Sequence, residues 1–189
     1  MPGRFAAQAL LTLALLTLGG CASVPPISAP ATLPAAQDAW TLKGRIGVQH
    51  GEESVSGQLH WQHRADRDEL LMISPLGQGV ARIVRDAGGV MLEVPNQPPR
   101  HAPDVESLTR EMLGYALPVS GLAWWVQARP DPSSPFEVRH DEGGRVAQLR
   151  QNGWVIDYLQ YTEDARPRRL TVTREGLLIR LVADSWQAE

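Results

Sequence analysis

Two neighbouring segments of this chain alternate apolar and polar residues with a period of two. In residues 40–48 the apolar or small side chains occupy every second position, and residues 55–61 repeat the pattern. Because successive side chains of a strand point to opposite faces, the alternation predicts two strands, each with one buried face. Residues 50–53 between them are typical of a hairpin turn. The chain is therefore expected to build an antiparallel sheet with one face on the core.

The rest of the chain continues this pattern with short strands and two short helices. Asn152-Gly153 is a pair that supplies the positive φ of a tight hairpin. Asp104 is a suitable N-cap for a helix that ends near Gly114, and Pro118 can open a second helix over residues 119–127. Residues 95–103 contain four prolines and are expected to be loop. Further strands are expected at residues 70–73, 80–84, 90–94, 136–140, 145–151, 154–161, 169–175 and 177–183.

These elements predict a mainly β fold of the α+β class. About ten or eleven antiparallel strands form a strongly curved sheet, an incomplete β-barrel, because large sheets curl. The two short helices are the elements available to cover its apolar face. A curled sheet covered by short helices leaves an apolar cavity that suits a greasy ligand.

The N-terminus resembles a bacterial lipoprotein signal. Arg4 precedes an apolar run from Ala6 to Leu18, and Gly19-Gly20 lead into Cys21, the only cysteine of the chain. The resemblance implies cleavage before Cys21, a diacylglyceryl group on its thiol and acylation of the new amino terminus. A plain secretory signal or a membrane-spanning helix is the alternative, although spanning needs about 20 apolar residues. The expected plan is a signal peptide at 1–20, the lipidated cysteine with a flexible tether at 21–38, and one domain at 39–189.

Charge and motifs argue against nucleic acid and against catalysis. Removal of residues 1–20 takes away Arg4 alone among charged residues, so the net charge changes from −3 to −4. A mildly acidic protein does not favour nucleic acid. The five histidines form no zinc-binding spacing, no Gly-x-Ser-x-Gly motif occurs, and the acidic cluster around Asp66 and Asp68 is typical of a solvated turn. His60 and His63, three apart on a strand, point to opposite faces and are expected to be solvated or edge residues. We expect no catalytic residues, no metal and no cofactor.

Motifs along the mature chain, taken in order, resemble the LolB family of outer-membrane lipoproteins. The lipobox and the tether match the family, and the middle loops are too generic to add support. The matching positions are Lys43-Gly44, Trp61, Ser74-Pro75-Leu76-Gly77, Leu113-Gly114, Leu117-Pro118, Leu122, Trp125, Asn152-Gly153-Trp154, Leu170, Gly176, Ile179, Leu181 and Trp186.

This resemblance implies a function. A LolB-like protein takes client lipoproteins from the periplasmic carrier LolA by binding their acyl chains, and inserts them into the outer membrane. Leu76, between Pro75 and Gly77, corresponds to the leucine of the family's protruding loop that enters the phospholipid. Ala22-Ser23 lack the aspartate that retains lipoproteins at the inner membrane, which implies an outer-membrane anchor at Cys21, facing the periplasm. We expect a monomer.

The residues of the acyl-binding cavity are candidates only, because ordinary core packing explains each of them equally well. Two other functions also remain open: another lipid-binding or assembly-factor lipoprotein of the envelope, and an anchored periplasmic hydrolase. Co-purified acyl chains would argue against the hydrolase, and dependence on the loaded carrier would separate the two lipid-binding functions. The candidate cavity residues are Leu42, Ile46, Leu59, Trp61, Leu122 and Trp125.

Overall fold

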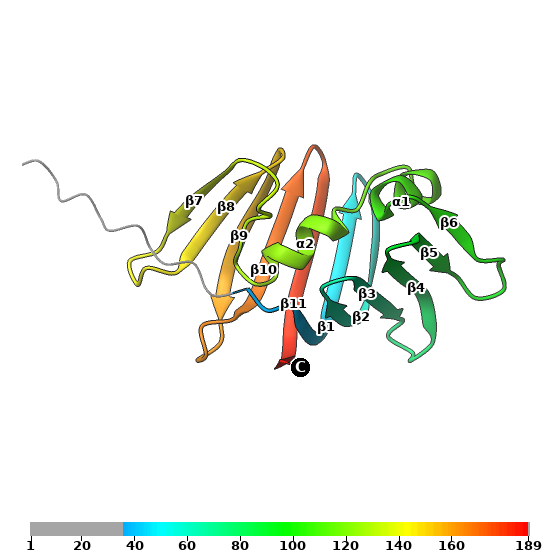
Figure 1. The fold of residues 1–189 in the computed structure, drawn as a ribbon, viewed down its shortest axis with the longest axis horizontal. Coiled ribbons are helices and arrows are strands. Elements are labelled where there is room, and N and C mark those ends of the chain that lie inside the picture. The colour runs from blue at the N-terminus through cyan, green and yellow to red at the C-terminus, as the bar shows by residue number, and fades with distance from the viewer. Residues whose placement is uncertain (1–35, 189) are drawn as a thin grey trace, which may run out of the picture. The chain divides into compact units, whose positions relative to one another are not determined.

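The computed structural model describes residues 36–188. All the strands that it describes belong to one antiparallel sheet, in the order β6-β5-β4-β3-β2-β1-β11-β10-β9-β8-β7 (Figure 1). The edge strands β6 and β7 do not pair with each other, so the sheet stays open. The signal peptide and Cys21 lie outside the described residues. The strands are β1 (Ala39–His50), β2 (Glu53–Arg64), β3 (Arg67–Ile73), β4 (Gly79–Asp86), β5 (Gly89–Glu93), β6 (Arg100–Ala102), β7 (Phe136–His140), β8 (Val146–Gln151), β9 (Trp154–Tyr161), β10 (Pro167–Arg174) and β11 (Leu177–Ala188).

The predicted fold class is confirmed, and the strands that differ most from the expected ones are β6 and β11. Strand β6 lies in the segment that was expected to be loop. Its three residues include no proline, and they pair with β5 from Val90↔Ala102 to Leu92↔Arg100. Strand β11 runs beyond the expected end at residue 183, because it continues to pair with the start of β1 as far as Trp40↔Ala188.

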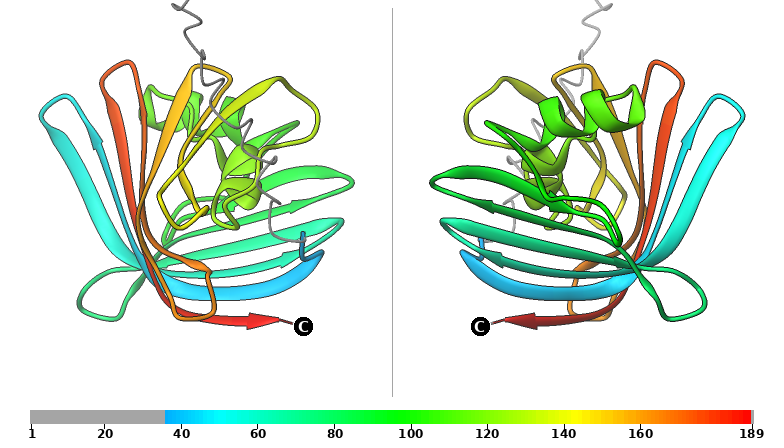
Figure 2. Two further views of the ribbon diagram at one scale, coloured as in Figure 1. Left: turned by 90° about the vertical axis from the view of Figure 1, so that its left-hand side faces the viewer. Right: turned by 90° about the vertical axis from the view of Figure 1, so that its right-hand side faces the viewer.

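Two short helices lie against the concave face of the sheet, α1 (Val105–Leu113) and α2 (Val119–Trp125) (Figures 1 and 2). The predicted caps of α1 are confirmed. The side chain of Asp104 accepts a hydrogen bond from the Ser107 amide at 2.6 Å, and Gly114 has the left-handed φ of 80°. The C-terminus of α2 is tied to β9, where the Tyr158 hydroxyl donates to the Trp125 carbonyl at 2.8 Å.

A cluster of aromatic rings lies on the buried face of the sheet, at the start of β1. Trp40 is fully buried, and its ring centroid lies 5.0 Å from that of Trp61 and 5.2 Å from that of Trp186, both in edge-to-face geometry. Such pairs add about 0.5–1.5 kcal/mol beyond the area they bury. The cluster therefore fastens β1 to both of its neighbours, β2 and β11.

Strands β1 and β2 bend sharply, so that one half of the sheet turns toward the other (Figure 2). Glycines stand where the backbones come close. A Cβ at Gly44 would lie 2.1 Å from the Val182 carbonyl oxygen, beside the register shift between Lys43 and Gly44. A Cβ at Gly57 would lie 2.5 Å from the Ile73 carbonyl oxygen. In the Lys43-Gly44 pair, steric crowding therefore explains why the second residue is glycine.

Replacing Gly44 by alanine is expected to lower the free energy of unfolding by about 1–3 kcal/mol, because the new methyl group overlaps rigid backbone and the strands must shift. Gly47→Ala is the matched control on the same strand, since its nearest neighbour would be the Ser56 Cβ at 3.8 Å. Urea denaturation of the two variants measures the difference. Equal stability of both variants would contradict this account of the bend.

Candidate functional site

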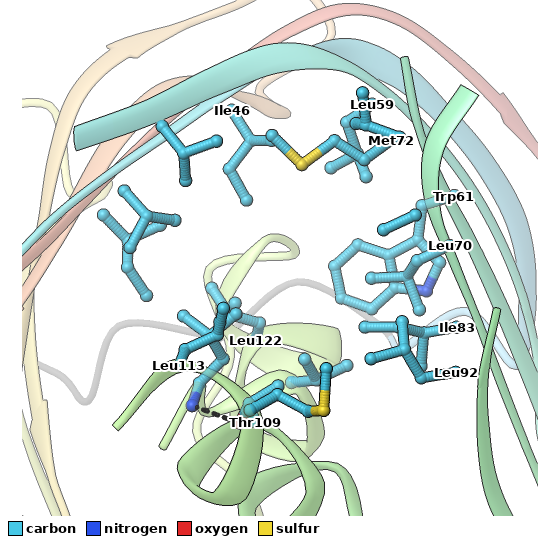
Figure 3. A pocket seen from close by; sticks show the side chains of 18 of the residues that line it. Ile46, Leu59, Trp61, Leu70, Met72, Ile83, Leu92, Thr109, Leu113 and Leu122 are labelled. Carbon is cyan, nitrogen blue, oxygen red and sulfur yellow. Dashed lines mark hydrogen bonds between the residues drawn. The ribbon is translucent and has the colours of Figure 1, made fainter. Parts of the chain in front are cut away.

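An apolar cavity of about 280 Å³ lies between the sheet and the helices (Figure 3). The bent strands form one wall, and α1 and α2 form the other. No charged side chain lines it. The hydroxyl of Thr109 is already satisfied, because it donates to the Val105 carbonyl at 2.8 Å and accepts from the Leu117 amide at 2.9 Å. A largely apolar wall without charged groups suits hydrocarbon. The lining residues are Ile46, Val48, Val55, Leu59, Trp61, Leu70, Met72, Val80, Ala81, Ile83, Leu92, Val94, Thr109, Met112, Leu113, Tyr115, Leu117, Val119, Leu122, Ile179 and Leu181.

Four of the six candidate residues lie on the wall of this cavity: Ile46, Leu59, Trp61 and Leu122. The other two are buried elsewhere.

Leu42 lies between Trp61 and Trp186 in the ladder, on the part of β1 before the bend. Trp125 points toward the far half of the sheet. Its ring packs near Trp154, and its indole N–H donates to Gln151 Oε1 at 3.0 Å. Contact of the four wall residues with an acyl chain stays a prediction.

Sequence reasoning did not find the wall that β3, β4 and β5 contribute. Leu70, Met72, Ile83 and Leu92 all face the cavity. Each of them stands in a short segment of four or five mostly apolar residues. In such short runs the face that points inward depends on the register with the neighbouring strand. The sequence shows that these segments are apolar, but which of their residues face the cavity is known only once the strand pairing is known.

The cavity reaches the surface at three apolar residues. Val55, Val80 and Leu113 line it and are also 47%, 37% and 46% exposed. Val80 lies in β4, directly after the loop that carries Leu76. The mouth of the cavity and this loop are therefore joined by a few residues of chain.

The loop between β3 and β4 presents Leu76 to solvent. This side chain is 89% exposed, the highest value among the exposed large apolar residues of the described chain. The turn is closed by two backbone hydrogen bonds, from Ser74 N to Gln78 O at 2.7 Å and from Gly77 N to Ser74 O at 2.9 Å. Gly77 adopts the positive φ of 83° that the turn needs. A small closed turn thus holds an apolar side chain away from the core.

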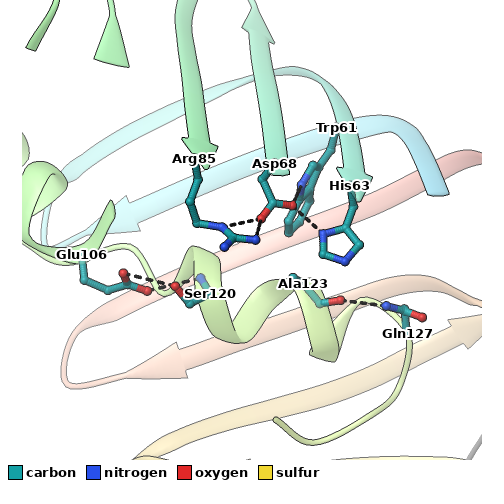
Figure 4. Close-up of polar contacts among 8 residues, drawn as sticks. All are labelled: Trp61, His63, Asp68, Arg85, Glu106, Ser120, Ala123 and Gln127. Atoms are coloured by element: carbon teal, nitrogen blue, oxygen red, sulfur yellow. Dashed lines mark hydrogen bonds and ion pairs between the residues drawn. The ribbon is translucent and has the colours of Figure 1, made fainter. Parts of the chain in front are cut away.

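Trp61 of the cavity wall also belongs to a polar cluster around Asp68 (Figure 4). Asp68 is 1% exposed and accepts hydrogen bonds from Trp61 Nε1 at 2.9 Å, His63 Nδ1 at 2.6 Å and Arg85 Nε at 2.7 Å. The expectation of a solvated acidic turn is wrong for Asp68, and that of a solvated histidine is wrong for His63, whose ring also stacks on Trp40. Pairing of β2, β3 and β4 brings these residues together.

The carboxylate of Asp68 is held in its charged form. Burial alone raises its pKa, but the hydrogen bonds from His63, Trp61 and Arg85 and the charge of Arg85 outweigh burial, so the pKa lies below its usual value. The charged carboxylate fixes the Trp61 ring, which is part of the cavity wall.

Asp68→Asn is expected to lower the free energy of unfolding by about 2–4 kcal/mol, because Arg85 and His63 lose their buried charged partner. Asp66→Asn, in the exposed turn two residues before, is the control. Thermal melts measure both variants.

The pH dependence of stability has a definite sign. A depressed folded-state pKa contributes stability that is complete above the unfolded value of about 4 and is lost as the pH falls through the folded value. The wild type should therefore lose stability more steeply on acidification than Asp68→Asn. Parallel curves would contradict the assigned role of Asp68.

Two other features are absent from residues 36–188. No group of three or more His, Cys, Asp and Glu side chains is arranged to hold a metal ion. No helix in this part of the chain has the length and apolar character needed to cross a membrane.

Comparison with known proteins gives one consistent family. The family model described as "Outer membrane lipoprotein LolB" matches residues 38–186. An outer-membrane lipoprotein LolB from Thiobacillus denitrificans is 62% identical over 172 residues, which cover 90% of this chain and 92% of that protein. One from Pseudomonas putida is 40% identical over 153 residues, which cover 79% of this chain and 75% of that protein.

A solved structure has the same fold. The crystal structure of a LolA superfamily protein from Nitrosomonas europaea superposes with a TM-score of 0.54 at 11% identity, over 85% of this chain and 90% of that one. At this identity the likeness shows the fold alone. The family model and the close sequence relatives carry the assignment, and the chain belongs to the family of the outer-membrane lipoprotein LolB.

Proposed function

We propose that this LolB-family protein accepts lipoproteins from a LolA-type carrier by binding their acyl chains in the apolar cavity, and then inserts them into the outer membrane. The observation that carries the proposal is the joint placement of cavity and loop. A cavity without charged lining residues opens at Val80, and the loop with the exposed Leu76 immediately precedes that strand. The exposed leucine is therefore only four residues along the chain from the cavity rim.

Transfer of an acyl chain from the carrier to this protein needs no covalent chemistry. Burial of apolar surface contributes roughly 25 cal/mol per Å², so an acyl chain gains free energy in any apolar site. A carrier and an acceptor can exchange it in one direction if the acceptor binds more tightly, and about 1.4 kcal/mol gives a tenfold bias. The cavity of about 280 Å³ is slightly smaller than most ligand sites, which span roughly 300–1,000 Å³. Long chains therefore require α1 or α2 to move outward.

The proposed anchor fits the same scheme. Cleavage of the signal peptide at 1–20 leaves Cys21 to carry the lipid, and the tether at 21–38 leads into the domain. Where the structure begins, the Gln37 amide donates to Gln127 Oε1 at 3.0 Å, so the chain joins the domain just after α2. We propose a monomer at the periplasmic side of the outer membrane, with client lipoproteins, the carrier and phospholipid as its partners.

Met72→Gln tests the cavity. The amide would face an apolar wall, and an unpaired amide there costs about 1–3 kcal/mol, so affinity for a fluorescent fatty acid should fall about tenfold. Leu159→Gln is the matched control, because Leu159 is 58% exposed and does not line the cavity. Both variants should keep their melting temperature within a few degrees. Unchanged fatty-acid binding by a folded Met72→Gln would rule out the cavity as the acyl site.

Leu76→Glu tests delivery. A carrier loaded with a labelled lipoprotein is mixed with this protein, and vesicles are then added. The variant should accept the label from the carrier as the wild type does but fail to pass it to the vesicles, because burying one leucine in lipid is worth about 1.5–3 kcal/mol and a charge there is unfavourable.

Leu159→Glu serves as the control for the added charge on an exposed leucine. Delivery by Leu76→Glu at the wild-type rate would refute the role of the loop. A label that never leaves the carrier, even with the wild type, would refute the acceptor function itself.

A further inference from the structure

The convex face of the central strands carries a group of basic side chains. Along β1, Leu42, Gly44 and Val48 are buried toward the helices, so the exposed Lys43 and Arg45 point to the opposite face. The same alternation places Arg180 of β11 and Arg169 of β10 on that convex face. We name Lys43, Arg45, Arg169 and Arg180 the convex basic patch.

The strand register brings these residues close together. Arg45 and Arg169 both lie opposite Val182, on either side of β11. Neighbouring strands are about 4.8 Å apart, so their Cα atoms are separated by about 10 Å. Arg180 is two residues from Val182 along β11, and Lys43 is two residues from Arg45 along β1. The patch thus occupies a compact area of three adjacent strands.

The patch is only partly neutralised. Arg45 pairs with Asp184, with Nη2 and Oδ1 3.0 Å apart. Arg180 donates to the uncharged Gln49 at 3.3 Å. Within residues 36–188, no carboxylate pairs with Lys43, Arg169 or Arg180. A protein with a net charge of −3 therefore concentrates three unpaired cations on one side of its sheet.

The loop with Leu76 starts beside this patch. Ile73, the last residue of β3, pairs with Gln58, and Gln58 pairs with Arg45. The loop therefore begins two strands away from Arg45. In the side views, the β3–β4 loop extends away from the helices, on the convex side of the sheet (Figure 2).

We propose that the convex basic patch binds the anionic phospholipid surface of the membrane and thereby holds the Leu76 loop against the bilayer. The inference rests on the proposed function, since it explains how the loop is presented. One leucine binds a bilayer too weakly to hold a protein there, and stable contact takes a second interaction. Each basic side chain near an anionic membrane strengthens binding about fivefold at moderate salt.

The test is vesicle flotation of residues 31–189, which contain the whole described core but lack Cys21. Vesicles of zwitterionic phospholipid are compared with vesicles that also contain phosphatidylglycerol. Wild-type binding should increase with phosphatidylglycerol and decrease at high salt. R169Q/R180Q should bind the anionic vesicles about 25-fold more weakly, at about fivefold per cation.

The control is R100Q/R110Q, which removes the same amount of charge from the helix side of the domain, at β6 and α1. This variant should bind vesicles within about twofold of the wild type, because a charge more than a Debye length from the membrane is screened. Melting temperatures confirm that all variants fold. The proposal is overturned if wild-type binding does not increase with phosphatidylglycerol. It is also overturned if R169Q/R180Q binds the anionic vesicles as strongly as the control variant. If R169Q/R180Q keeps vesicle binding but accepts less lipoprotein from the carrier, the patch docks a protein and the membrane proposal is wrong.

Fatty-acid binding is measured on the same samples. If the wild type binds no fatty acid, the acyl-binding cavity is refuted, but the vesicle experiment still tests the basic patch. The proposed function and the membrane-binding patch can therefore be refuted independently.

Discussion

The structure depends on the burial of one apolar face of a very large sheet. Eleven antiparallel strands present that face to the inside, and the two helices that cover it have only nine and seven residues. Such short helices cannot fill the concave side with side chains, so part of the apolar surface remains as a cavity wall. The same hydrophobic effect that folds the domain thus leaves a site that favours hydrocarbon. In the proposed function, an acyl chain fills the part of the core that the chain itself leaves empty.

The bend of β1 and β2 sets the shape of that cavity, and two kinds of residue support it. Gly44 and Gly57 let backbones approach where any side chain would collide. Asp68 ties Trp61 of β2 to Arg85 of β4, so the wall next to the bend is held by charged hydrogen bonds as well as by packing.

Local patterns predicted most of this fold. Alternation in β1 and β2, the Asn152-Gly153 hairpin and the caps of α1 depend on residues close in sequence, and all of them appear as expected. The outward position of Leu76 also follows from its own turn. The pairing partners of Asp68 and His63, and the separation of Leu42 and Trp125 from the cavity, depend on strand register and on where the sheet bends. Both arise from contacts between distant segments, so a single sequence does not reveal them.

Photolabelling shows whether the cavity between the sheet and the helices holds acyl chains. A lipoprotein whose acyl chain carries a diazirine near its end is loaded from the carrier, irradiated, and mapped by mass spectrometry. The account predicts labels on cavity residues such as Met72 and Leu122, with none on Leu42 or Leu159. Labels spread over the outer face of the sheet, with none inside the cavity, would contradict it.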